Sequence, residues 1–164
     1  MKRFFTTLML MAVATMTFWS CEKDNSLKGS YAYYAPVTNW ELTMDGVRAE
    51  MKNASGWEED TEYPGYNEIV YVNSKTNADL HYEFSNEKLR SASILYWGCL
   101  DKFETMKKDW EKAYGVEFEE KTVMGMTIWE AKVPNTSTEL ELQRIEGEKD
   151  SYMVVTARNM GMVW

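Results

Sequence analysis

The sequence predicts an α+β fold in which two helices pack on one face of an antiparallel sheet. Its 164 residues, 45% hydrophobic and 27% charged, have the size and composition of one globular domain. Two segments carry apolar residues at helical spacing, and each is followed by several β-rich runs. Short clusters of turn residues separate these runs, and short connections join antiparallel neighbours.

The first helical pattern begins at Thr38. The run Thr38-Asn39-Trp40-Glu41 matches a capping box, in which the threonine hydroxyl and the glutamate carboxylate bind early backbone amides. Trp40, Met44, Val47 and Met51 then follow at spacings of four, three and four. This spacing places all four side chains on one stripe of a helix.

Strand patterns follow the first helix. Residues 68–72 are β-rich, and residues 80–84 alternate apolar and polar side chains in the manner of a half-buried strand. Residues 89–97 form the next run, with Ala92, Ile94 and Tyr96 on one face. Residues 57–63 are polar and give no clear strand pattern.

A second helical pattern, again followed by strand patterns, comes next in the sequence. Residues 101–114 carry Phe103, Met106 and Trp110 on one stripe, and Gly115 is placed to end this helix in the left-handed conformation. The strand patterns that follow cover residues 116–123, 127–133, 139–145 and 151–158.

We therefore expect two tandem α-β-β-β units, each with an optional fourth strand, at residues 38–98 and 99–164. Units of this size bury too little surface to be stable alone, so they would share one core. The alternative is one continuous α+β domain whose second helix interrupts its strands. By element order alone, the arrangement resembles tandem helix-plus-antiparallel-sheet envelope modules of the β-lactamase-inhibitor-like type.

Residues 1–20 have the parts of an export signal peptide. Lys2 and Arg3 give a positive start, and an apolar run from Phe4 to Phe18 leads to Cys21. This run is about 15 residues long, shorter than the ~20 needed to cross the hydrocarbon core of a membrane as a helix.

The end of this signal resembles a bacterial lipobox, with Phe18-Trp19-Ser20-Cys21 at the cleavage site. Phe18 departs from the usual leucine, as in the looser lipoboxes of Bacteroidota-type bacteria, and Glu22-Lys23-Asp24 resembles their surface-export signal. The resemblance implies cleavage before Cys21, diacylglycerol on its thiol and an acyl chain such as palmitate on its amine. It also implies an outer-membrane lipoprotein of the cell envelope, facing the periplasm or the surface.

Two or more acyl chains hold a protein on a membrane stably, so a lipidated Cys21 would need no spanning helix. Residues 21–37 would then be the lipid-anchored tether, with a small, polar and flexible first half. The tyrosines in its second half could instead add an edge strand to the domain.

Charge and composition exclude several function classes. Without Lys2 and Arg3 the chain has 16 basic and 26 acidic residues, a net charge of −10. An acidic surface repels the nucleic-acid backbone, so we expect no nucleic-acid partner. One histidine and two cysteines leave no basis for a His/Cys metal site, and we expect no metal and no cofactor.

Nothing in the sequence identifies a catalytic residue, and we expect no enzyme activity. It contains no nucleophile elbow, zinc-binding helix or phosphate-binding loop motif. His81 lies on the polar face of its strand, and Cys99 lies among apolar residues as a small buried side chain. Paired acids such as Glu119-Glu120 leave an acidic-site hydrolase as the lesser alternative.

Binding is the function that the composition favours. Trp57, Tyr63, Tyr66 and Tyr71 lie close to a Pro-Gly turn and could form an exposed aromatic patch. We therefore expect a membrane-anchored, non-enzymatic envelope domain that binds a protein or carbohydrate partner on its concave sheet face or loops. A structural or assembly component of the outer membrane is the alternative.

Overall fold

The computed structural model describes residues 29–62, 65–147 and 151–161. Within these residues, a helix followed by four strands occurs twice along the chain. The first set is α1 (Met44–Met51), β1 (Glu58–Glu59), β2 (Glu68–Asn73), β3 (Ala78–Ser85) and β4 (Lys88–Trp97). A 3-10 turn, η1 (Leu100–Lys102), leads into the second set: α2 (Phe103–Tyr114), β5 (Glu119–Val123), β6 (Met126–Lys132), β7 (Thr138–Glu146) and β8 (Ser151–Asn159).

The described residues form an essentially all-β fold, so the predicted α+β class is wrong. Strands hold 44% of these residues and helices only 18%. All eight strands belong to one antiparallel sheet, whereas the α-helices are 8 and 12 residues long. The prediction gave the helices too much weight because it began the first one too early and left β1 without a strand assignment.

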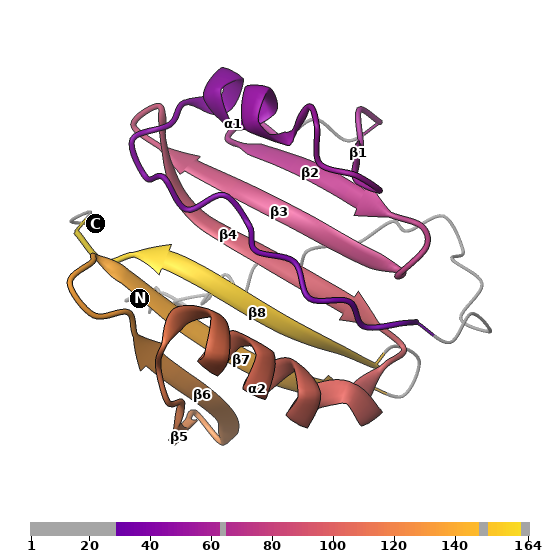
Figure 1. The fold of residues 1–164 in the computed structure, drawn as a ribbon, viewed down its shortest axis with the longest axis vertical. Coiled ribbons are helices and arrows are strands. Elements are labelled where there is room, and N and C mark those ends of the chain that lie inside the picture. Colours follow the sequence, from indigo (N-terminus) through magenta and orange to yellow (C-terminus); the bar gives the residue numbers. More distant parts are fainter. Residues whose placement is uncertain (1–28, 63–64, 148–150, 162–164) are drawn as a thin grey trace, which may run out of the picture.

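The sheet joins the two sets of strands through their last members. The strand order is β1-β2-β3-β4-β8-β7-β6-β5, so each set is a meander with its first strand at an edge of the sheet (Figure 1). The central pair, β4 and β8, is antiparallel from Ser91 opposite Arg158 to Trp97 opposite Tyr152. This pairing makes a single sheet from segments far apart in the sequence.

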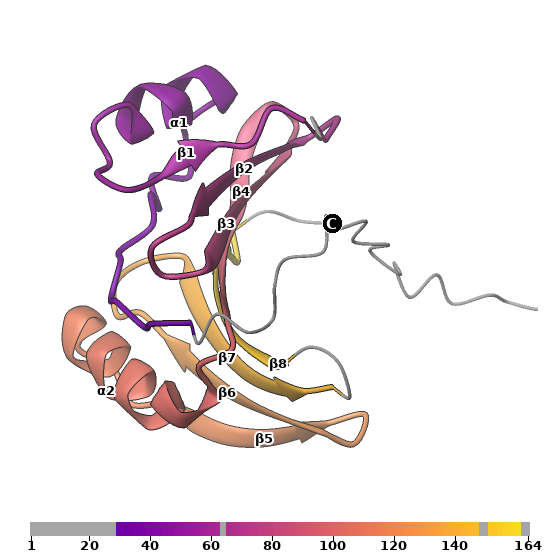
Figure 2. The same cartoon turned by 90° about the vertical axis from the view of Figure 1, so that its right-hand side faces the viewer.

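One face of the sheet carries both helices and residues 29–43, as Figure 2 shows. The strands alternate toward this face: in β3 the buried residues Ala78, Leu80, Tyr82 and Phe84 alternate with half-buried polar ones. The helices add buried side chains over this face, and residues from both sets form one continuous hydrophobic core. The predicted alternation of residues 80–84 is confirmed.

Helix α1 starts at Met44, so the predicted capping box at Thr38 is wrong. The hydroxyl of Thr43 caps the helix by accepting a hydrogen bond from the Gly46 N–H at 3.3 Å. Trp40 therefore lies before the helix, where it is buried against β7. Two members of the predicted stripe, Val47 and Met51, are buried on the helix as expected.

Residues 29–37 are part of the domain, which corrects the predicted 21–37 tether. The ring of Tyr31 lies 5.1 Å from that of Tyr96, and Tyr34 lies 5.1 Å from Trp57. This described part crosses the helix-bearing face of the sheet and adds no edge strand (Figure 1). Residues 21–28, including Cys21, lie outside the described residues.

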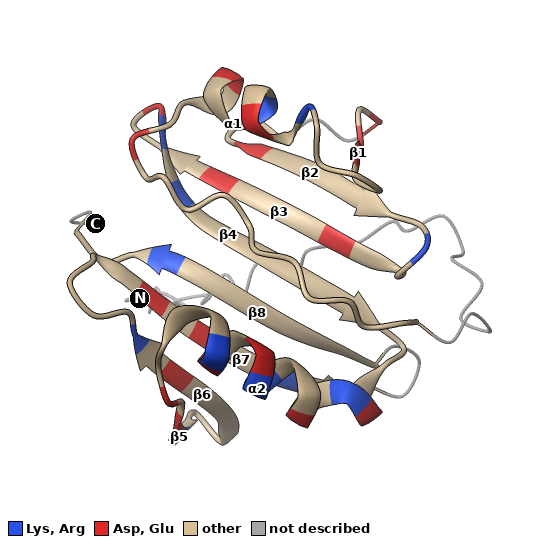
Figure 3. Cartoon of the chain, in the orientation of Figure 1, with Lys and Arg blue, Asp and Glu red and all other residues tan. Residues whose placement is uncertain are grey.

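Helix α2 matches the second helical prediction closely. It begins at Phe103 after η1 and ends at Tyr114, and Phe103, Met106 and Trp110 are its buried residues. Gly115 follows with a φ of 64°, the left-handed conformation predicted for it. Acidic and basic residues are interspersed on the exposed side of this helix (Figure 3).

Candidate functional site

The face of the sheet opposite the helices is the main candidate for a binding surface. Within the described residues no helix covers it (Figure 2). Because neighbouring residues of a strand point to opposite faces, the strand register assigns side chains to this face in rows across the sheet. These rows fall into two zones, one charged and one apolar.

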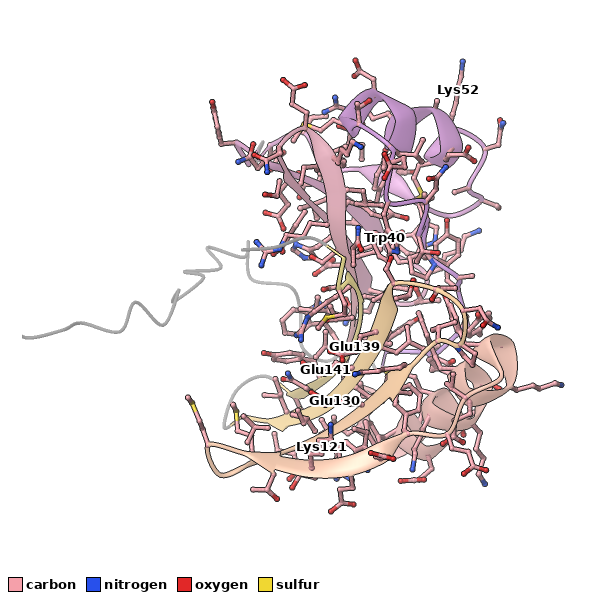
Figure 4. The ribbon with its side chains drawn as sticks, turned by 90° about the vertical axis from the view of Figure 1, so that its left-hand side faces the viewer. Trp40, Lys52, Lys121, Glu130, Glu139 and Glu141 are labelled. Carbon is pink, nitrogen blue, oxygen red and sulfur yellow. The ribbon has the colours of Figure 1, made fainter. Side chains whose placement is uncertain are left out.

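The charged zone runs across five neighbouring strands from β3 to β6 and reaches β5 at the edge. Figure 4 shows three of its members, Glu141, Glu130 and Lys121. Its members share one property: each makes a hydrogen bond or ion pair with a neighbour on the same face. They are Glu83, Ser91, Arg158, Glu141, Gln143, Glu130 and Lys121.

Arg158 and Glu141 form the central pair of the charged zone. The two guanidinium nitrogens of Arg158 donate to the two carboxylate oxygens of Glu141 at 2.8 and 2.9 Å. Gln143 donates a further hydrogen bond to Glu141 at 2.5 Å. The Glu141 side chain is only 8% exposed, so these bonds replace the water that a carboxylate needs. Lys121 and Glu130 pair at 2.6 Å nearer the edge.

The apolar zone lies on the same face, toward the end of the sheet formed by the end of β4 and the start of β8. Leu95 and Ile128 are 9% and 5% exposed, and the other members are half-buried. A face of an antiparallel sheet that no helix covers usually carries polar side chains. On a face that is free of helices in the described part of the chain, these apolar residues are therefore unusual. The zone consists of Leu95, Trp97, Ile128, Ile145, Tyr152 and Val154.

An aromatic pair lies at the centre of the apolar zone. The rings of Trp97 and Tyr152 are 4.8 Å apart, with an angle of 46° between their planes. The indole N–H of Trp97 donates to a carboxylate oxygen of Asp79 at 2.7 Å, which fixes the ring on the sheet. Burial raises the pKa of Tyr152, so its hydroxyl stays protonated at neutral pH.

The structure does not bring the predicted aromatic patch to one surface. Trp57 and Tyr71 are 8% and 5% exposed and belong to the core, where Tyr71 contacts Tyr82. Tyr66, by contrast, is 95% exposed. Tyr63, like the lipid-attachment residue Cys21, lies outside the described residues.

The candidate catalytic side chains are already engaged or buried. His81 lies on the helix-free face as expected, but its side chain is only 13% exposed and its Nδ1 lies 2.6 Å from Glu68. Cys99 is 1% exposed, and burial raises the pKa of its thiol to about 11. This confirms the expectation that Cys99 is a buried side chain. Among the described residues there is no group of three His, Cys, Asp or Glu that could hold a metal.

The sequence interpretation missed the apolar zone. In β4 it identified the face of Ala92, Ile94 and Tyr96, but Leu95 and Trp97 give the opposite face an apolar half as well. Apolar residues on both faces of β4 were the feature of the sequence that could have indicated the apolar zone. The meaning of this feature depends on β8, which adds Tyr152 and Val154 to the same surface.

Comparison with protein-family models found no match, and comparisons with curated proteins and with solved structures found no significant match. None of the helices in the described part of the chain is long and apolar enough to cross a membrane.

Proposed function

We propose that this protein is a lipid-anchored, non-enzymatic protein of the cell envelope that binds a protein partner through its apolar zone. The observation that carries the proposal is the half-buried Trp97–Tyr152 pair, surrounded by aliphatic side chains on a sheet face that neither described helix covers. Surfaces of this kind typically mark binding sites. The anchor rests on the lipobox resemblance around Cys21.

Aliphatic residues favour a protein partner over a carbohydrate. Ile145 and Val154, which are half-buried, provide area that a protein interface can bury as its apolar centre. Aromatic residues beside such a centre are the side chains most often responsible for binding energy. The charged zone beside it gives the polar rim that such an interface has.

The absence of enzyme activity is supported by the state of the reactive groups. The thiol of Cys99 is protonated at neutral pH because burial raises its pKa, and a catalytic cysteine requires the thiolate. Both oxygens of Glu141 accept hydrogen bonds from Arg158, which leaves no free carboxylate at the centre of the charged zone.

The anchor is tested by fractionating cells that express Cys21→Ala. We expect this variant to leave the membrane fraction, whereas the control Cys99→Ala, which changes the other cysteine, should remain there. Unchanged membrane partitioning of Cys21→Ala would contradict the anchor.

The binding surface is tested by placing a photo-crosslinking amino acid at position 154, in the apolar zone, in living cells. We expect one discrete crosslinked protein, and addition of Tyr152→Glu should abolish it. The control position is Lys108, an exposed residue of α2 on the opposite face. Equal crosslinking at both positions would contradict the assigned surface, and crosslinking to glycan alone would favour the carbohydrate partner.

A further inference from the structure

The hairpin between β5 and β6 ends in exposed apolar side chains. Val123, Met124 and Met126 are 43%, 88% and 56% exposed. Val123 and Met126 form the last pair of the two strands, so Met124 and Gly125 make a two-residue turn. We name Val123–Met126 the hairpin tip.

The backbone at this tip requires a conformation that methionine does not favour. Met124 has a φ of 51° and Gly125 a φ of 83°, both in the left-handed region. In the other two-residue turn, between β3 and β4, the first position is Asn86, a residue that adopts this region more readily. The chain thus places a large apolar side chain where both exposure and backbone geometry disfavour it. Such outliers gather at functional sites.

The hairpin tip projects beyond the sheet (Figure 2). β6 pairs with β5 from Met126 onward, but it pairs with β7 only from Ile128, opposite Gln143. The two strands separate beyond that pair and leave an open depression of about 560 Å³ that Trp129 and Ile145 help to line. Among the described residues, the tip therefore has no strand paired to it on the side that faces β7.

The tip lies at the end of the sheet where the chain from Cys21 joins the domain. The Ser30 hydroxyl donates to the carbonyl of Lys75, in the turn between β2 and β3. A Cβ on Gly29 would lie 1.7 Å from the carbonyl oxygen of Trp97. Residue 29 can therefore lie this close to the end of β4 only because glycine has no side chain. In an antiparallel sheet of this order, the β2–β3 turn, the end of β4 and the β5–β6 turn share one end.

The length of the chain and the spacing of the strands allow Cys21 and the hairpin tip to reach the same membrane surface. Eight residue steps separate Cys21 from Gly29, a span of at most about 29 Å. β4 and β5 are four strand positions apart, which is about 19 Å. A domain held by Cys21 can thus turn this end of the sheet toward the bilayer.

From this arrangement we infer that the hairpin tip inserts into the interfacial layer of the membrane that holds Cys21, as a second, apolar contact. The inference rests on the proposed lipid anchor. A net charge of −10 without the signal residues gives no attraction to anionic lipids, so the contact depends on the apolar side chains. Val123, Met124 and Met126 supply these side chains. Because the anchor already holds the domain at the membrane, the effective concentration of lipid at the tip is high and a weak insertion is sufficient.

The test uses the full lipidated protein, reconstituted into vesicles of phosphatidylethanolamine and phosphatidylglycerol. A fluorophore is attached to Met124→Cys in a Cys99→Ala background, and quenchers are placed on the lipid acyl chains. The control carries the fluorophore at Asn86→Cys, an equally tight turn at the opposite end of the sheet. We expect several-fold stronger quenching at position 124 than at position 86.

The outcomes separate the two proposals. Protein that sediments with the vesicles but shows equal quenching at both positions overturns the hairpin contact and leaves the anchor intact. Protein that does not sediment with the vesicles overturns both. Shielding of position 124 in intact cells but not in vesicles overturns the lipid contact in favour of a protein that covers the tip.

Discussion

The indole N–H of Trp40 donates a hydrogen bond to the hydroxyl oxygen of Thr138, 3.0 Å away, across 98 positions of the sequence. Both residues are buried, at 9% and 7% exposure. Trp40 precedes α1, and Thr138 is the first residue of β7. The bond therefore ties the segment before the first helix to the second set of strands.

This relationship predicts that the hydroxyl of Thr138 is required for stability. Thr138→Val removes the acceptor and leaves the buried indole N–H of Trp40 unpaired, which should cost about 1–3 kcal/mol. The matched control, Thr138→Ser, keeps the hydroxyl and should cost less. Urea unfolding followed by tryptophan fluorescence measures both, and equal losses for the two variants would contradict the role of the bond.

The same long-range bond shows why the start of α1 could not be predicted from the sequence. Thr38 and Thr43 both precede helix-compatible residues, and the local pattern at Thr38 is the better capping box. Burial of Trp40 against Thr138 holds residue 40 outside the helix and leaves Thr43 as the cap. Local spacing contains no information about a partner in β7.

Strands and the second helix were predictable because their signals are local. The alternation around Tyr82 and the stripe through Trp110 each arise from residues within one element. The apolar zone is different, since it forms only when β4 pairs with β8 and brings Trp97 beside Tyr152. A single sequence does not state which strands are neighbours, so the zone could not be assembled from it.

Trp110 is expected to be a main contributor to the core beneath α2. It is fully buried and stacks on Tyr114 at 5.3 Å. Trp110→Ala should lower the free energy of unfolding by about 3–5 kcal/mol through lost burial and the cavity left behind. Lys108→Ala, on the exposed side of the same helix, should change it by less than ~0.5 kcal/mol. Similar melting temperatures for the two variants would refute this assignment.

The carboxylate of Glu141 should stabilise the fold because Arg158 depends on it. Glu141→Gln keeps the shape of the side chain but leaves the Arg158 guanidinium without its charged acceptor, at a cost of about 1–3 kcal/mol. Glu139→Gln is the control, since Glu139 lies on the same strand and face but is half-buried, and Arg158 bonds to Glu141 rather than to it. Its effect should be below ~0.5 kcal/mol. Thermal denaturation at low and high salt compares them, and equal losses would exclude a special role for Glu141.

Cys99 should be unreactive in the folded protein. It is 1% exposed, and burial raises the pKa of its thiol to about 11, with a smaller contribution in the same direction from Asp101. At pH 8 the thiol is therefore both covered and protonated, and alkylating reagents require an accessible thiolate. Iodoacetamide followed by mass spectrometry should modify Cys99 only after denaturant is added. Rapid modification of the native protein would show that residue 99 is accessible.

The same thiol makes stability depend on pH in a defined direction. An ordinary cysteine has a pKa of 9.0, and that of folded Cys99 is about 11. Between these values the unfolded chain loses its thiol proton while the folded chain keeps it, so unfolding becomes more favourable as pH rises. This loss should be absent below pH 9 and complete above about 11. Buried tyrosines act in the same direction, so the wild type is compared with Cys99→Ala by urea unfolding at several pH values. The wild type should lose more stability than the variant over this range, and parallel curves would mean that the folded thiol titrates normally.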